Sequence, residues 1–343
     1  MADTPQKLSD LYIPTIENAY VNERSTTQSK LWTSGLVVPN ADLSRQLGAS
    51  IGGNQFITPF NQSIEDLVAE DGNDDVADLI EQKSWGTSSY QANAVSRTKS
   101  FGMMNLATIF AGNNPVSVLN KQLSTFWTNN YQSELVACLT GLFADNVAND
   151  SGDMVEDVFE DSATPSAAAY ANSDSIIDAM HTMGDLNGEL AGGAIIMHSK
   201  TKKLLQKAEP NNFVPASQSD IGFATYLGLM IIEDDGVPVD TTPTNADKYV
   251  SYIVGGGIFQ YAQDPRQSNQ EWDREIRAGH GTGNDYLVTR RRFILAPQGW
   301  DVAISGGDNE SMPTRAQLAL ATTWARKVAS RRQVKLAALY HNV

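Results

Sequence analysis

Side chains with the chemistry for catalysis or metal binding are few in this chain and are scattered along it. There is one cysteine, Cys138, and the four histidines are His181, His198, His280 and His341. The sequence contains no phosphate-binding P-loop, no H-E-x-x-H and no C-x-x-C motif that would bring such groups together. Each histidine is therefore better explained as a hydrogen-bonded or surface side chain than as a catalytic one.

Two glycine-rich runs and one acidic run come nearest to binding motifs. Gly255-Gly256-Gly257 and Gly279-His280-Gly281-Thr282-Gly283 lack the strand–loop–helix context and the following lysine of a nucleotide site, so bends in strands explain them better. Asp71-x-Asn73-x-Asp75 resembles the start of a calcium loop, but Val76 and Gln82 stand where that loop needs glycine and glutamate. We therefore expect no catalytic residues, no metal and no cofactor, and the chain is predicted not to be an enzyme.

The element that carries Cys138 is the clearest in the sequence. Asn114 suits an N-cap, and Pro115 suits the first position of a helix. Apolar residues then recur every three or four positions as far as Phe143, which predicts an amphipathic helix of about 30 residues. Because Cys138 falls on the apolar stripe, it is predicted to be a buried and inert thiol.

Ahead of this helix, residues 52–105 predict a long β-ribbon. Gln55–Phe60 alternates like a strand, an apolar stretch follows at Phe101–Phe110, and a charged tip lies between them. Eight acidic side chains belong to the tip: Glu65, Asp66, Glu70, Asp71, Asp74, Asp75, Asp78 and Glu81. An exposed ribbon of this length is poorly stable alone, so we expect it to pack on a partner.

The rest of the chain divides into an arm and an α/β region. Residues 1–49 have scattered apolar anchors, prolines and no compact periodicity, which predicts an arm lying across another surface. From about residue 171 the pattern predicts helices at 173–184, 199–209 (capped by Ser199) and 314–324, and strands at 194–197, 229–232, 249–254, 257–261, 286–295 and 333–340.

The net charge of −15 is unevenly distributed, with acids dominating residues 1–199 and bases dominating residues 290–343. Two explanations stay open. The acidic and basic regions of neighbouring copies attract each other, or the basic stretch binds nucleic acid; the overall negative charge favours the first. The single cysteine rules out an internal disulfide, and neither a signal peptide nor an apolar run long enough to span a membrane is apparent.

The order of these parts resembles the major capsid proteins of tailed bacteriophages, which have the Hong Kong 97-type capsid fold. Short stretches of sequence add to the likeness, most of all to long-tailed siphophage coat proteins: Leu11-Tyr12-Ile13-Pro14, Ala194–Ser199, Tyr249–Gly257 and Arg291–Gly299. The resemblance implies an α+β fold. It has an N-terminal arm (1–49), an extended β-ribbon loop or E-loop with flanking strands (50–110), a spine helix with peripheral domain (111–170), an α/β axial domain (171–285), and return strands of the peripheral domain with the C-terminus (286–343).

The same resemblance implies that copies assemble as hexamers and pentamers into an icosahedral shell around viral double-stranded DNA. The expected location is the virion capsid, assembled in the host cytoplasm. Expected partners are other copies of the chain, a separate scaffolding protein, a portal, a decoration protein, and packaged DNA without sequence-specific contact; no membrane is expected. Subunit contacts are predicted at Phe56, Glu70, Asp71, Asp74, Asp75, Trp85, Arg290, Arg291 and Arg292.

Three alternatives remain at this point. A nanocompartment (encapsulin-like) shell protein would share the fold and enclose cargo enzyme in place of DNA. A phage tail or connector protein would form rings or tubes. An α/β enzyme is disfavoured by the absence of a catalytic motif.

Overall fold

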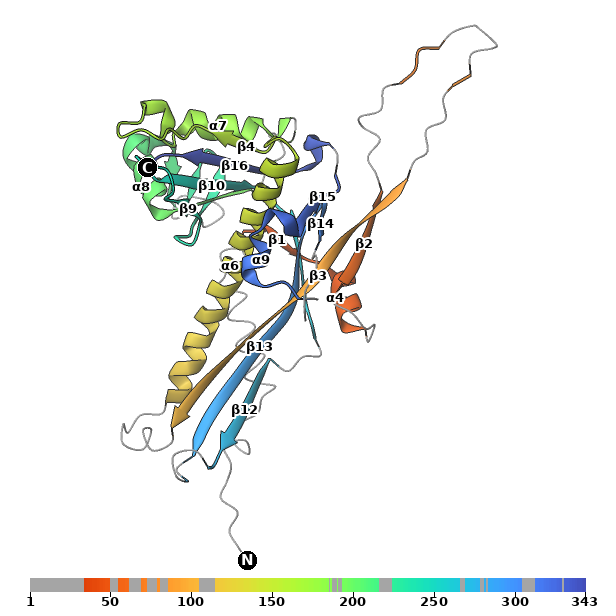
Figure 1. Cartoon of the computed structure of the whole chain (residues 1–343), viewed down its shortest axis with the longest axis vertical. Helices are drawn as coiled ribbons and strands as arrows, with labels where there is room; N and C mark the ends of the chain where they lie inside the picture. Colours follow the sequence, from red (N-terminus) through yellow and green to blue (C-terminus); the bar gives the residue numbers. More distant parts are fainter. Residues whose placement is uncertain are drawn as a thin grey trace, which may run out of the picture.

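One long helix and two large β-sheets make up most of the body, and a β-ribbon projects from it (Figure 1). The computed structural model describes residues 34–49, 55–61, 69–72, 79–80, 86–104, 115–184, 186, 190, 193–215, 224–265, 269–277, 281, 283–303, 312–328 and 330–343. Among the described residues, no helix is both long enough and apolar enough to cross a membrane.

The long helix α6 runs over Pro115–Asn149 and spans 35 residues, or about 52 Å. It confirms the helix predicted from the apolar period, whose N-cap Asn114 lies outside the described residues. Its two halves pack on different sheets. The ring of Tyr131 lies 5.0 Å from Phe293 of the first sheet, and Phe143 stacks 5.2 Å from Tyr252 of the second. The helix therefore joins the two sheets through one continuous core.

The first sheet has six strands and carries the ribbon. Its strands, in spatial order, are β1 (Val37–Pro39), β11 (Phe259–Gln263), β13 (Asn284–Pro297), β3 (Thr87–Met104) and β2 (Gln55–Asn61), with β12 (Gln270–Glu275) paired to β13. The strand β3 is 18 residues long and uses two partners in succession. Residues 87–93 pair with β2, and residues 94–104 pair with β13, so one strand runs through both ribbon and body.

The second sheet has eight strands and is covered on both faces. Its order is β4 (Val155–Asp157), β16 (Leu336–His341), β10 (Lys248–Val254), β5 (Ala194–Met197), β8 (Leu229–Glu233), β7 (Thr225–Tyr226) and β6 (Phe213–Val214), with β9 (Val239–Asp240) paired to β10. Ile196 packs in the core shared with α6, whereas Ile195 packs with α7 (Ser173–His181) and α8 (Ser199–Ala208) on the other face. Such a two-sided burial explains the continuous apolar runs of β5 and β10.

Smaller elements complete the structure. They are α4 (Ala41–Gly48), α9 (Arg315–Leu318), the strand pair β14 (Trp300–Val302) and β15 (Trp324–Arg326), and 3-10 turns at Ala167–Ala169, Pro210–Asn212, Ala321–Thr323 and Arg331–Gln333.

The extended arm predicted for residues 1–49 is wrong for its last part. Residues 1–33 lie outside the described residues, but Val37–Pro39 pairs with β11, and α4 follows it. The side chain of Asn40 accepts from the backbone N–H groups of Asp42 and Leu43 and so caps the helix. Only two apolar residues of α4, Leu43 and Leu47, face the core, which is too short a pattern for the sequence to reveal.

Three other predictions are corrected by the structure. The second ribbon limb begins at Thr87, well before the apolar stretch at Phe101, because its polar residues lie on a half-exposed strand. The N-cap of α8 is His198, whose Nδ1 accepts from Lys200 N–H, and not Ser199. The helix predicted at 314–324 ends at Leu318, whose carbonyl accepts from the Trp324 indole at 2.7 Å.

The predicted strands at 194–197, 229–232, 249–254, 257–261 and 286–295 are confirmed to within two residues at most ends. The terminal strand predicted at 333–340 is β16, and it begins three residues later. It pairs with β10 in the eight-stranded sheet, whereas β13 belongs to the sheet of the ribbon. The C-terminal part of the chain is therefore shared between the two sheets.

Candidate assembly surfaces

The side chains that could act in catalysis or bind a metal are used for packing or hydrogen bonding where the structure describes them. No three His, Cys, Asp or Glu side chains among the described residues are grouped to hold a metal. Cys138 is buried, and desolvation, followed by the nearby Glu134 carboxylate, raises the pKa of its thiol. The string Gly48–Gly52 matches the G-x-S-x-G pattern, but it begins at the last residue of the helix α4, whereas a nucleophile elbow follows a strand.

Two of the histidines have clear structural partners. His341 is fully buried, and its Nδ1 lies 2.9 Å from the Asn342 carbonyl while Nε2 lies 2.9 Å from Ser251 Oγ. Desolvation lowers the pKa of His341 to about 4, so the ring is neutral at ordinary pH. His198 caps α8, as described above, and His280 lies outside the described residues.

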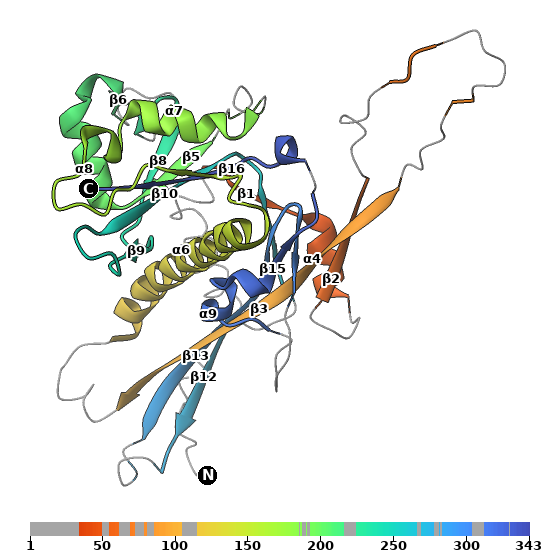
Figure 2. The ribbon, with the colours of Figure 1, turned by 45° about the horizontal axis from the view of Figure 1, so that its top comes forward.

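The ribbon is the first surface available for assembly. Its strands pair antiparallel from Gln55 opposite Asn93 to Asn61 opposite Thr87, and β2 is the edge strand. Alternate residues of β2 face opposite sides: Phe56 is buried, whereas Ile57 is 59% exposed. We call residues 62–86 the tip. Figures 1 and 2 show two of its described segments, 69–72 and 79–80, beyond the paired strands and away from the body.

The predicted contact residues of the ribbon fall into three groups. Glu70 and Asp71 are exposed on the tip, as a surface contact requires. Asp74, Asp75 and Trp85 lie outside the described residues. Phe56 is only 7% exposed and packs with α4, so the structure makes it a core residue and removes it from the contact surface.

The three consecutive arginines of β13 are used within the chain and do not form a free basic patch. Arg290 makes an ion pair with Glu271, and Arg292 makes one with Asp264 at 3.0 Å. Arg291 is 1% exposed and lies over the ring of Trp127 at 5.2 Å. The alternation of side chains along a strand could have shown that Arg291 points to the other face.

A buried carboxylate that the sequence did not single out joins the ribbon strand to the long helix. Glu134 of α6 is 1% exposed and accepts from Arg97 of β3 at 2.8 and 3.0 Å and from Arg315 of α9 at 3.0 Å. Arg97 also donates to the carbonyl of Pro313 at 3.0 Å. The only signal in the sequence is an acid close to the apolar positions of a helix.

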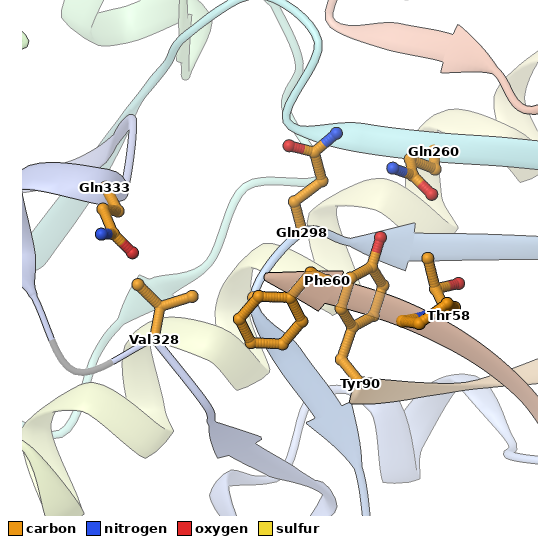
Figure 3. Close-up of a pocket in the computed structure, with 9 residues that line it drawn as sticks. Thr58, Phe60, Tyr90, Gln260, Gln298, Val328 and Gln333 are labelled. Carbon is orange, nitrogen blue, oxygen red and sulfur yellow. The ribbon is translucent and has the colours of Figure 1, made fainter. Parts of the chain in front are cut away.

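A groove at the base of the ribbon is the second surface, and no motif marked it. It consists of two adjoining cavities of about 340 and 250 Å³, and Gln260 and Gln298 line both. Figure 3 shows the larger one, where Phe60 of the ribbon lies between Val328 and Tyr90. Among the residues that the structure describes, no charged side chain lines either cavity. The groove therefore suits a neutral and partly apolar occupant.

Known proteins resemble this chain over nearly its whole length, although no protein-family model matches it. The major capsid protein of Bacillus phage SPP1 is 27% identical over 327 residues, which cover 93% of each chain. The capsid of Ralstonia phage GP4 shares the fold with a TM-score of 0.58 at 7% identity, covering 91% of this chain and 88% of that one. The capsid protein of cyanophage Pam1 does so with a TM-score of 0.60 at 9% identity, covering 93% and 92%.

The structure has the ribbon, the long helix and the α/β sheet in the order that the sequence resemblance implied. The relative and the structural neighbours agree with that order over nearly the full chain. The chain therefore has the Hong Kong 97-type capsid fold, and over nearly its whole length it is similar to the major capsid proteins of tailed bacteriophages, which are structural subunits of the virion capsid.

Proposed function

We propose that copies of this chain assemble as hexamers and pentamers, which tile an icosahedral shell around double-stranded DNA. The observation that carries this proposal is the ribbon, which extends a tip with exposed acids and aliphatic side chains away from its own body (Figure 1). A projecting two-stranded ribbon is marginally stable without a partner, so packing on a neighbouring copy supplies the missing contacts.

We further propose that the E-loop (50–110) carries these contacts and that the arm (1–49) adds others from residues 1–33. The spine helix falls within 111–170, and the axial domain (171–285) is centred on the eight-stranded sheet, to which β4 and β16 also belong. The placement of β16 in that sheet supports assigning residues 336–341 to the axial domain rather than to the return strands of 286–343.

The charge of the subunit supports contact with DNA that is weak and independent of sequence. The net charge is −15, and all three arginines of β13 are engaged within the chain. Tight binding to DNA would need a concentrated basic face that neutralises phosphates. A scaffolding protein, a portal and a decoration protein are the further partners that we propose from the resemblance.

Expression of the chain with candidate scaffolding partners, followed by electron microscopy, tests the proposal. Closed particles with five-fold and six-fold capsomers are the expected result. A chain that stays monomeric at every concentration, with and without these partners, would contradict it.

A further inference from the structure

The tip of the ribbon presents two adjacent aliphatic side chains to solvent. Leu79 is 85% exposed and Ile80 is 78% exposed, more than the other large apolar side chains that the structure describes. In sequence they lie between Asp78 and Glu81, so acids flank the pair. Two neighbouring aliphatic residues at the end of a projecting loop gain about 1.5–3 kcal/mol each when fully buried. The pair is therefore suited to insertion into another surface.

The groove at the base of the ribbon has matching chemistry. Phe60, Tyr90 and Val328 give its larger cavity an apolar lining, and Val38 does the same in the smaller one. Its volume of about 340 Å³ lies in the range of cavities that hold small ligands or a few side chains. The carboxamides of Gln260, Gln298 and Gln333 lie around it, and such groups can both donate to and accept from a peptide backbone (Figure 3).

The tip does not fill the groove of its own chain. The exposure of Leu79 and Ile80 shows that neither side chain is inserted into its own chain. Each copy thus offers an exposed aliphatic pair on the tip and an apolar groove where the second half of β2 faces the body. A contact between two different surfaces of identical subunits is head-to-tail, and it closes into a ring when the rotation between copies allows.

We propose that Leu79 and Ile80 of one copy occupy the groove at the base of the ribbon in a second copy. This inference rests on the proposed shell function and names the contact that the ribbon makes in it. In sequence, acids flank the pair on both sides, so the aliphatic pair itself is the anchor of the contact.

Disulfide trapping in assembled particles tests this contact directly. Cys138 is buried and the pKa of its thiol is raised, so it reacts poorly with the introduced cysteines. The native chain should therefore form no covalent multimers on oxidation. We expect the double variant Leu79→Cys, Gln333→Cys to form a ladder of covalent multimers on oxidation, since the two positions would come within disulfide reach between copies. The matched control Leu79→Cys, Ile276→Cys uses an exposed residue beyond β12 and should give no ladder.

The outcomes separate this inference from the proposed function. Closed particles without a ladder, when both cysteines of the first variant react with maleimide, would overturn the contact and leave the shell function standing. If the variant Ile13→Cys, Gln333→Cys gives a ladder and the variant Leu79→Cys, Gln333→Cys does not, the arm fills the groove. That result would also overturn the proposed contact of the tip. Failure of the native chain to form particles would count against the proposed function itself.

A second variant measures how much Leu79 and Ile80 contribute to assembly. Leu79→Ser, Ile80→Ser should raise the subunit concentration needed for assembly about tenfold or more, because two buried anchors are lost. Ile57→Ser removes an exposed aliphatic residue from the edge strand and is expected to change that concentration less. Equal effects of the two variants would contradict the assignment of the anchor to the tip.

Discussion

At the scale of single residues, the carboxylate of Glu134 holds two arginines that are distant in sequence. Arg97 comes from the ribbon strand and Arg315 from the short helix α9, and both donate to Glu134 on the long helix. The side chain of Arg97 is 20% exposed and that of Arg315 is 44% exposed, so water compensates part of their charge. The buried partner is thus the acid, and its loss leaves the guanidinium of Arg97 poorly paired.

We expect Glu134→Gln to lower the free energy of unfolding by about 2–4 kcal/mol, somewhat less than for a fully buried pair because both arginines are partly exposed. Urea unfolding of the unassembled subunit measures the change. The control Glu271→Gln removes the carboxylate that pairs with Arg290 at the surface and should cost less than about 1 kcal/mol. Equal costs would show that the buried network adds no stability beyond a surface pair.

The second residue-scale prediction concerns acid. His341 is neutral in the fold, and its pKa drops from 6.5 to about 4, so between these values the unfolded chain binds the extra proton. Stability from this group is present in full above about pH 6.5 and is lost as pH falls toward 4, by up to about 3 kcal/mol. The groups around the ring, Ser251, Tyr249 and the Asn342 carbonyl, provide no carboxylate that would offset the proton.

Unfolding of the subunit by urea between about pH 7 and pH 4.5 checks this slope. His341→Gln should reduce the loss of stability over that interval relative to the native chain, whereas His181→Gln at an exposed position should not. Burial raises the pKa of Asp145, so this group makes the fold more stable as the pH falls, opposite to His341. Because the native chain and both variants contain Asp145, its effect cancels when their slopes are compared. Identical slopes in all three would contradict the role of His341.

At the scale of elements, the parts with a long regular pattern are the predictable ones. The helix α6 repeats its apolar period over many turns, and β5 and β10 are short apolar runs between turns, so both types are evident in the sequence. The helix α4 has two core residues in eight positions, and β3 is largely polar where it pairs with β2. Such elements are specified by the surface on which they dock, and a local pattern cannot reveal that surface.

The contact between α4 and β2 gives a test at this scale. Phe56 packs with Leu43 and Leu47 and so fixes the ribbon to the body. We expect Phe56→Ala to lower the free energy of unfolding by about 3–5 kcal/mol through the cavity it leaves. Thermal or urea unfolding measures it.

Ile57→Ala is the matched control, since it changes the next residue on the opposite and exposed face of the same strand. Its expected cost is below about 0.5 kcal/mol. A similar cost for both variants would mean that β2 is not docked on α4 as the structure has it.

At the scale of the whole molecule, the groove is a feature that could not be predicted from the sequence. Its lining comes from β2, β3, β11 and the segments after β13 and β15, which are up to about 270 residues apart. No spacing within the chain indicates that Phe60, Gln260 and Val328 meet. The exposure of the tip, in contrast, could be predicted from its acidic residues. The order of ribbon and helix in the sequence was enough to suggest a capsid subunit.

Deleting residues 65–82 should separate folding from assembly. The deletion removes most of the tip (62–86) and leaves both sheets and α6 intact, so we expect a folded subunit with the melting temperature of the native monomer that fails to close into shells. Sedimentation and electron microscopy measure particle formation. A Gly/Ser segment of equal length in place of 65–82 is the control for loop length, and closed shells from either variant would contradict the role of the tip.

The continuous strand β3 has a mechanical consequence. Tension applied to the ribbon by a neighbouring subunit runs along the strand axis, through the seven pairs with β2 and then the eleven pairs with β13. Because this load is parallel to the strands, it strains many backbone hydrogen bonds together instead of opening them one after another. In the proposed shell, outward pressure from packaged DNA would thus be resisted in shear by the ladders of β3 with β2 and β13.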